Sequence, residues 1–328
     1  MSKHLKSTVL RVTISLCSLG ILIFVSWGKF GGALSHLSDL SLFPLILGVV
    51  IYLATIAIIS VRLKLILSLQ KVALSFSRLY YLGIVSLFFS LFLPSAVGGD
   101  IAKAYYIYKD CDDKMATVSS ILIDRFLGLA AAISLGYAAF FAVGKQADSP
   151  QIGLLLLCLA SFILAVTLLV LSQRFSSPVR TFLFAATPKK FRFRLEQIFS
   201  ALRVFQTNKT QLLIGYGYSV VAQILFIFIV SLLARSLHVE LPLWVFYLLI
   251  PVVTVCSLVP SVGGLGVREV STVYLFSRYI AAEQAVALSF LIVLFIYGIG
   301  AACGILYAFR GGASIREIER IEEAVEEM

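Results

Sequence analysis

Long apolar runs separated by short polar segments make up most of the chain. Six of them approach the roughly 20 residues that cross a bilayer as a helix, at 9–27, 41–60, 121–143, 152–172, 211–234 and 285–309. Two shorter runs, 79–93 and 243–259, each stop at a break that contains proline and glycine. Because lipid offers no partners to exposed backbone groups, segments that span it must be helices. The pattern therefore predicts an all-α, polytopic integral membrane helical bundle.

The break that ends the two shorter runs is a repeated phrase. Pro94-Ser95-Ala96-Val97-Gly98-Gly99-Asp100 returns loosely as Pro260-Ser261-Val262-Gly263-Gly264-Leu265-Gly266, in which the stretch from Pro to Gly-Gly is one residue shorter. The segments that follow, 101–109 and 267–280, are too short to span a bilayer alone. We therefore expect two helical hairpins, 79–109 and 243–280, that enter the membrane, turn at the phrase and return to the side they came from.

The positions of Lys and Arg orient this arrangement. With a cytoplasmic N-terminus and both hairpins re-entrant, 21 basic residues fall in inside segments and 5 in outside segments, as the positive-inside rule requires. Arg62 is counted among the inside residues, in the segment after the 41–60 run. The two hairpins then have inverted orientations, an architecture typical of transporters. The prediction is a multi-pass protein of the cytoplasmic (inner) cell membrane with both termini in the cytoplasm.

The same pattern predicts a single membrane domain over residues 1–328. A first half, 1–172, and a second half, 211–309, each contain one hairpin, with a cytoplasmic linker at 173–210 and a cytoplasmic tail at 310–328. Gly300-Ala301-Ala302-Cys303-Gly304 is a GxxxG pattern in the last run, which favours close helix packing. That packing would lie either within the bundle or between the protomers of a homo-oligomer.

Composition excludes several other classes of protein. The chain is 60% hydrophobic and 13% charged, whereas soluble domains have about 25% charged residues. The net charge of +10 suits a basic cytoplasmic rim, and no nucleic-acid-binding motif is present, so no nucleic acid partner is expected. HExxH, GxSxG and P-loop motifs are also absent, so the sequence does not predict an enzyme, a metal site or a cofactor.

Ionisable residues at membrane depth are the candidate site, because they are costly in lipid unless they pair or face a polar cavity. They occur as three sets of opposite charge: Asp100 with Lys103, Asp124 with Arg125, and Arg268 with Glu269. The first two residues share a helix face at a spacing of three. Adjacent residues cannot face each other, so the other sets should reach partners on other helices. Arg125 with Asp100, or Arg268 with Asp124, would be suitable cross-pairs.

Two interpretations of these charges remain open. They are either internal clamps that hold the broken helices, or a site in which the cations bind a phosphate or anionic lipid headgroup and the carboxylates balance the charge. Gly98, Gly99, Gly263 and Gly264 lie where helices should begin, so their N–H groups could also bind an anion. Glycine in addition lets the backbone approach a ligand closely.

Three stretches together resemble a known family. They are the Pro94–Asp100 phrase with its downstream Lys103, the Asp124-Arg125-Phe126-Leu127-Gly128 stretch, and the string from Pro260 to Glu269. They resemble the lysylphosphatidylglycerol synthase transmembrane region, a flippase-like membrane domain related to the membrane part of bacterial multiple peptide resistance factors. The soluble domain that transfers lysine from lysyl-tRNA has no counterpart here, so the resemblance concerns the membrane part only.

The resemblance implies a protein that handles or flips lipids. We therefore expect a lipid flippase or transporter that binds and translocates an anionic phospholipid or a polyprenyl-phosphate-linked lipid, with a lipid-modifying enzyme as a further partner. The family pattern places its site roles on the six charged residues named above. Two alternatives stay open: a membrane enzyme that modifies a lipid headgroup or a lipid-linked sugar, and a scaffold that transports nothing.

Overall fold

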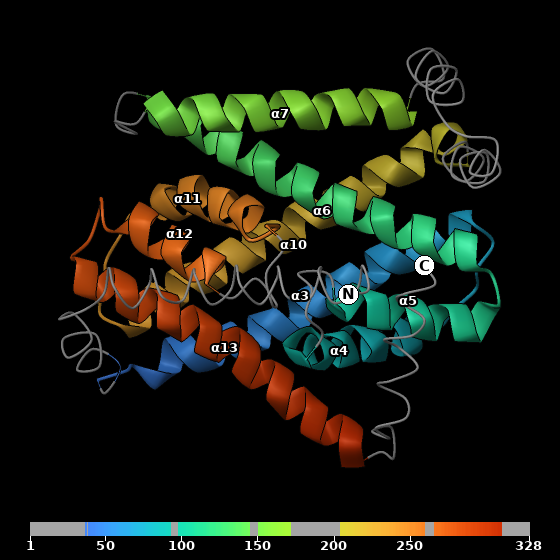
Figure 1. The fold of residues 1–328 in the computed structure, drawn as a ribbon, viewed down its shortest axis with the longest axis horizontal. Helices are drawn as coiled ribbons and strands as arrows, with labels where there is room; N and C mark the ends of the chain where they lie inside the picture. The colour runs from blue at the N-terminus through green and yellow to red at the C-terminus, as the bar shows by residue number, and fades with distance from the viewer. Residues whose placement is uncertain are drawn as a thin grey trace, which may run out of the picture. The chain divides into compact units, whose positions relative to one another are not determined.

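The fold is known from a computed structural model, which describes residues 37, 39–92, 98–144, 150–171, 204–259 and 266–309. In these ranges every regular element is an α-helix and no strand occurs (Figure 1). The helices are α3 (Leu42–Leu69), α4 (Phe76–Phe92), α5 (Gly98–Cys111), α6 (Lys114–Val143), α7 (Pro150–Leu171), α10 (Lys209–Ser236), α11 (Leu243–Cys256), α12 (Val267–Phe276) and α13 (Ala282–Phe309). The all-α prediction is thereby confirmed for the described residues.

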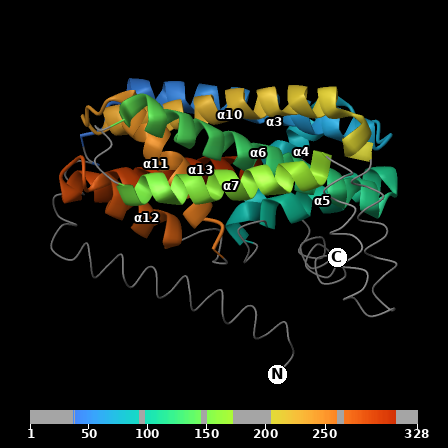
Figure 2. The ribbon, with the colours of Figure 1, turned by 90° about the horizontal axis from the view of Figure 1, so that it is seen from above.

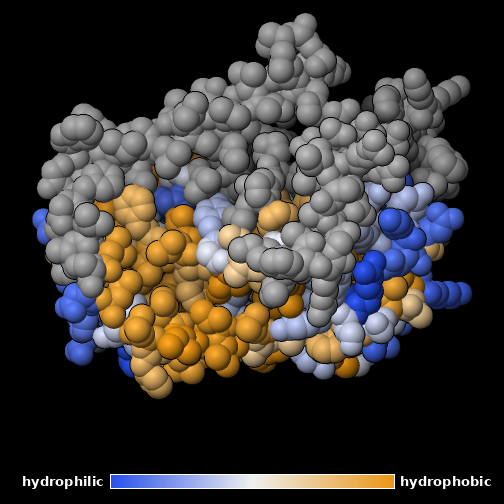
Figure 3. Space-filling model, turned by 90° about the horizontal axis from the view of Figure 1, so that it is seen from below, coloured by the Kyte–Doolittle hydropathy of each residue, from blue (hydrophilic) through white to orange (hydrophobic). Residues whose placement is uncertain are grey.

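Each apolar run that falls in these ranges forms a helix. Among the described residues, four helices are long and apolar enough to cross a membrane: Leu42–Leu69, Lys114–Val143, Lys209–Ser236 and Ala282–Gly304. Large apolar side chains are also exposed on the helices, as on Phe43, Phe162 and Leu294, and Figure 3 shows apolar residues over much of one surface. Such exposure is costly in water and suits contact with lipid. The predicted run at 9–27, residues 173–203 of the predicted linker 173–210, and the tail at 310–328 lie outside the described residues.

Local signals explain where α6 begins and ends. Asp113 caps its start and accepts a 2.9 Å hydrogen bond from the Ala116 N–H, as N-cap residues do. Gly144, with a φ of 55°, ends the helix and donates its N–H to the Phe140 carbonyl, because only glycine adopts this conformation freely. Capping thus starts α6 seven residues before the apolar run at 121, so its first two turns contain polar residues.

The chain divides into two compact units that interleave in the sequence. One unit contains residues 1–56, 81–105 and 224–328, and the other contains 57–80 and 106–223. The boundaries cut through α3, α4, α5 and α10. The halves 1–172 and 211–309 stay a prediction. Long helices therefore contribute to both units.

The first unit is built around the C-terminal helices. In it α12 packs against both α11 and α13, which lie together in Figures 1 and 2. The α3 segment is held against α13, where the rings of Tyr52 and Phe295 meet edge to face at 5.7 Å. Gly48 also lies beside the Phe295 ring, since a Cβ there would be in van der Waals contact with it at 3.4 Å.

The second unit is built around α6, which packs against α7. Its core is a cluster of five buried apolar residues: Ile66, Ile123, Leu127, Phe205 and Leu212. These residues come from α3, α6, α10 and the short helical segment 204–207 that precedes α10. Three separate stretches of sequence are therefore joined by one apolar core.

Two pairs of short helices occupy the positions of the predicted hairpins. In the first pair, Gly99 of α5 lies tight against α4, since a Cβ there would collide with the Ser90 hydroxyl and the Ser86 carbonyl. In the second pair, α11 packs against α12. At 1.5 Å per residue, none of the four helices reaches the roughly 30 Å of a hydrocarbon core. These lengths suit hairpins, and their re-entry to one membrane side stays a prediction.

The GxxxG pattern of the last run makes a contact within the chain. A Cβ at Gly304 of α13 would collide with the ring of Phe88 of α4. Of the two interpretations of this pattern, Gly304 thus fits close packing inside the bundle. The homo-oligomer stays a prediction.

Candidate functional site

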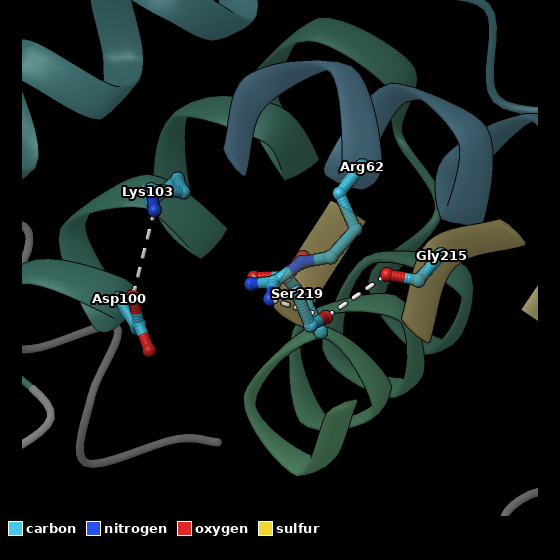
Figure 4. Close-up of polar contacts among 6 residues, drawn as sticks. Arg62, Asp100, Lys103, Gly215 and Ser219 are labelled. Atoms are coloured by element: carbon cyan, nitrogen blue, oxygen red, sulfur yellow. Dashed lines mark hydrogen bonds and ion pairs between the residues drawn. The ribbon is translucent and has the colours of Figure 1, made fainter. Parts of the chain in front are cut away.

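A buried cluster of charge joins three helices of the second unit. Arg62 of α3 donates from Nε to Asp124 Oδ1 at 2.6 Å and from Nη2 to Asp124 Oδ2 at 2.7 Å. Its Nη1 donates to Ser219 Oγ of α10 at 2.8 Å. Ser219 in turn donates to the Gly215 carbonyl at 2.9 Å, as Figure 4 shows. The two charged side chains are only 7% and 10% exposed, so the pair is both neutralised and hydrogen-bonded.

Two glycines lie close to this cluster. A Cβ at Gly128 would be in van der Waals contact with Arg62 Nη1 at 3.5 Å, and one at Gly215 would lie 3.2 Å from Leu127 Cδ1. The bidentate geometry uses the planar guanidinium, which matches a carboxylate with two parallel hydrogen bonds. Since both Asp124 oxygens are occupied, the cluster has the character of an internal clamp.

This cluster corrects two details of the sequence interpretation. Asp124 does find its partner on another helix, as expected, but that partner is Arg62 and not Arg268. Arg62 was counted among the cytoplasmic loop residues, whereas it lies inside α3 and is 6% exposed. The position of Arg62 inside a helix could have been predicted from the apolar residues Leu65-Ile66-Leu67, because they continue the apolar pattern beyond Arg62 and Lys64. Arg125 is half-buried on α6 beside Asp124.

The pair Asp100–Lys103 belongs to the first unit and forms as predicted. Lys103 Nζ lies 3.6 Å from Asp100 Oδ1 at a spacing of three on α5 (Figure 4). The two side chains are 10% and 15% exposed, respectively. Gly98 and Gly99 are buried at the start of the same helix. Asp100 stands in its first turn, where a carboxylate is stabilised by the helix dipole.

Glu269 closes the start of α12 in a similar way. Its Oε2 accepts the N–H of Gly266, whose φ of 87° turns the chain into the helix. Glu269 is 3% exposed, and its Oε1 is buried without a hydrogen-bond partner among the described residues. One carboxylate oxygen is therefore structural, while the other is a buried acceptor. Gly263 and Gly264 lie outside the described residues.

Arg268 lines a cavity of about 160 Å³ in the first unit. The walls come from α10, α11, α12 and α13, and most of them are Ile, Val and Phe side chains. Three hydroxyl residues also line it, Thr254, Ser257 and Thr272. Each hydroxyl donates to a carbonyl of its own helix, at 2.7–2.9 Å. A cation and three hydroxyls thus face one small space with otherwise apolar walls.

The predicted site residues are distributed over both units. Asp100, Lys103, Arg268 and Glu269 belong to the first, whereas Asp124 and Arg125 belong to the second. Residues 93–97 and 260–265 of the hairpin tips lie outside the described ranges, so the meeting of the two tips stays a prediction. No group of three or more His, Cys, Asp or Glu residues that could hold a metal occurs within the described ranges.

Apolar helices of spanning length, exposed apolar side chains and buried, paired charges define a multi-pass helical membrane protein. The chain belongs to the family of the lysylphosphatidylglycerol synthase TM region, whose family model matches residues 8–304. This match confirms the resemblance carried by the three motifs. No curated protein and no solved structure matches the chain.

Proposed function

We propose that this protein is a lipid transporter of the flippase type that binds and translocates an anionic phospholipid or a polyprenyl-phosphate-linked lipid. The observation that carries the proposal is the Arg268 cavity, because it places a guanidinium and three hydroxyl residues around one small space inside an apolar helix bundle. The family, which is related to lipid metabolism by its description, supports the same class of ligand.

In this proposal Arg268 binds the phosphate of the lipid, and the acyl chains stay in the bilayer. A guanidinium forms short, charge-assisted hydrogen bonds to phosphate oxygens. The hydroxyls of Thr254, Ser257 and Thr272 could rotate from their helix carbonyls toward the ligand. Glu269 balances the charge of the empty site, and transport alternates the exposure of the cavity between the two membrane faces. Both termini lie in the cytoplasm, and both hairpins are re-entrant.

A reconstitution experiment tests this function. The full chain is placed in liposomes with fluorescent phosphatidylglycerol or a fluorescent polyprenyl phosphate in the inner leaflet, and a membrane-impermeant quencher reports the probe that reaches the outer leaflet. We expect the wild type to transport the probe. In Arg268→Gln the transport rate should fall at least about tenfold, because the variant loses a hydrogen bond between charged groups. Arg278→Gln is the matched control, because Arg278 instead stacks on the exposed Tyr274 ring at 5.0 Å.

Each outcome decides a different point. Equal transport by wild type and a folded Arg268→Gln variant would overturn the assignment of the site. Absence of transport for every probe would overturn the function itself. Mass spectrometry of the recovered lipids tests the enzyme alternative, which predicts a chemically altered headgroup or lipid-linked sugar.

A further inference from the structure

A second cavity, of about 590 Å³, lies in the other unit. It is bounded by α6, α7 and the first two turns of α10, and it contains none of the predicted site residues. The two helices α6 and α7 approach closely where Gly153 lies against the Phe140 ring. In the view of Figure 1 they diverge from there toward their other ends. Its floor includes the buried core residues Ile123 and Leu127, and its rim includes the exposed Leu164 and Leu213. The cavity is therefore a groove that is open toward the surroundings of the unit.

The surface of the groove is almost entirely apolar. Four of its lining residues have hydroxyls: Ser134, Thr167, Tyr137 and Tyr216. Ser134 donates to the Ala130 carbonyl and Thr167 to the Ile163 carbonyl, both at 2.7 Å. Water in this groove would find few partners. Leaving these apolar walls without contact atoms would forfeit their dispersion contacts. The apolar walls therefore suit an apolar occupant, and in a membrane protein the bilayer supplies acyl chains.

The dimensions of the groove suit one acyl chain. Residues 123–138 of α6 line it and extend over about 22 Å at 1.5 Å per residue. This exceeds half of the roughly 30 Å hydrocarbon core, which is the share of one leaflet. The small side chains of Ala130, Ala138 and Ala160 leave the space open along this length.

Lys209 gives the groove a polar end. It lines the groove as the first residue of α10 and is exposed. The 28 residues of α10 extend over about 42 Å, so its ends reach the headgroup region, where Lys is commonly found. No acidic side chain is among the described residues that line the groove. The charge at its end therefore complements a lipid phosphate.

We propose that the groove between α6, α7 and α10 binds an anionic glycerophospholipid, with one acyl chain along α6 and the phosphate at Lys209. This site is separate from the Arg268 cavity in its residues and does not depend on the proposed transport. In this proposal the acyl chain of the bound lipid covers Ile123 and Leu127, which belong both to the groove and to the core of the second unit.

Photo-crosslinking in nanodiscs tests the proposal. The full chain is placed in phosphatidylcholine nanodiscs that contain phosphatidylglycerol with a diazirine in one acyl chain, and labelled peptides are mapped by mass spectrometry. We expect labels on groove residues of α6, α7 and α10. Lys209→Gln should lower this labelling about fivefold, the value of one basic residue near an anionic membrane surface, and should leave labelling by a diazirine phosphatidylcholine unchanged.

A filling variant gives an independent readout. Ala138→Trp places a large ring in the groove from an exposed position and should abolish groove labelling. Ala301→Trp is the matched control, an exposed alanine on α13 outside the groove, and should label as the wild type does. Absence of groove labels in the wild type would mean that protein segments fill the groove and would overturn the proposal. Equal labelling by the two phospholipids, unaffected by Lys209→Gln, would overturn the anionic specificity.

Discussion

Removal of one member of the buried Arg62–Asp124 pair should be among the most damaging single changes in the second unit. In Arg62→Met a thioether of similar reach replaces the guanidinium. The variant loses the bonds of 2.6 and 2.7 Å to Asp124 and of 2.8 Å to Ser219. The Asp124 carboxylate, with its side chain 10% exposed, is left without a cation.

The magnitude follows from the burial of the pair. Breaking a buried ion pair by removal of one partner costs about 3–5 kcal/mol, because an uncompensated charge stays inside. Arg62→Met and Asp124→Leu should each fall in this range. The double variant removes both charges and should lie within about 1 kcal/mol of the wild type, or be more stable. Ser219→Ala removes only one hydrogen bond to a charged group and should cost about 1.5 kcal/mol.

Reversible unfolding in mixed detergent micelles, followed by near-ultraviolet circular dichroism, measures these differences. The double variant should be more stable than either single variant. This result would show that the two side chains are energetically coupled, because each is costly only when its partner is removed. Single variants within about 1 kcal/mol of the wild type would refute the reasoning from burial. A folded double variant that loses lipid transport would show that Asp124 or Arg62 acts on the ligand and is more than a clamp.

Two further predictions concern helix contacts. Gly304→Ala should destabilise the protein by about 1–3 kcal/mol, because its new methyl group collides with the Phe88 ring; Gly298→Ala on the same helix is the control, since its Cβ meets nothing within 4 Å and should be neutral or stabilising in the same unfolding assay. Arg78→Ala breaks an ion pair to Asp110 whose side chains are 37% and 23% exposed. It should cost less than about 1 kcal/mol, and the loss should shrink in high salt; a larger, salt-independent loss would contradict this.

The helices were largely predictable from the pattern of apolar residues. The run at 41–60 corresponds to α3, and 211–234 corresponds to α10 within two residues at each end. Such agreement is expected, because lipid obliges any spanning segment to satisfy its own backbone as a helix. The pattern failed at the end of α3, where Arg62 and Lys64 lowered the local hydropathy although the helix continues to Leu69. Hydropathy averages the polarity of neighbouring side chains along the sequence. It does not include the ion pair with a distant residue that stabilises a buried charge such as Arg62.

The candidate site shows the same division. The spacing of three along one helix was enough to predict the pairing of Asp100 with Lys103, because helix geometry is local. The partner of Asp124 could not be predicted in this way, because Arg62 is distant in sequence and meets it only through the packing of α3 on α6.

The sequence by itself determined the class of protein, the positions of most helices and the family, since these depend on composition, local period and motif. Only the tertiary structure decided that Asp124 is clamped by Arg62, that Arg268 lines a cavity with three hydroxyls, and that α6, α7 and α10 enclose an apolar groove. These features depend on which helix faces meet, and that choice is made by side-chain packing and the pairing of buried charges across distant segments.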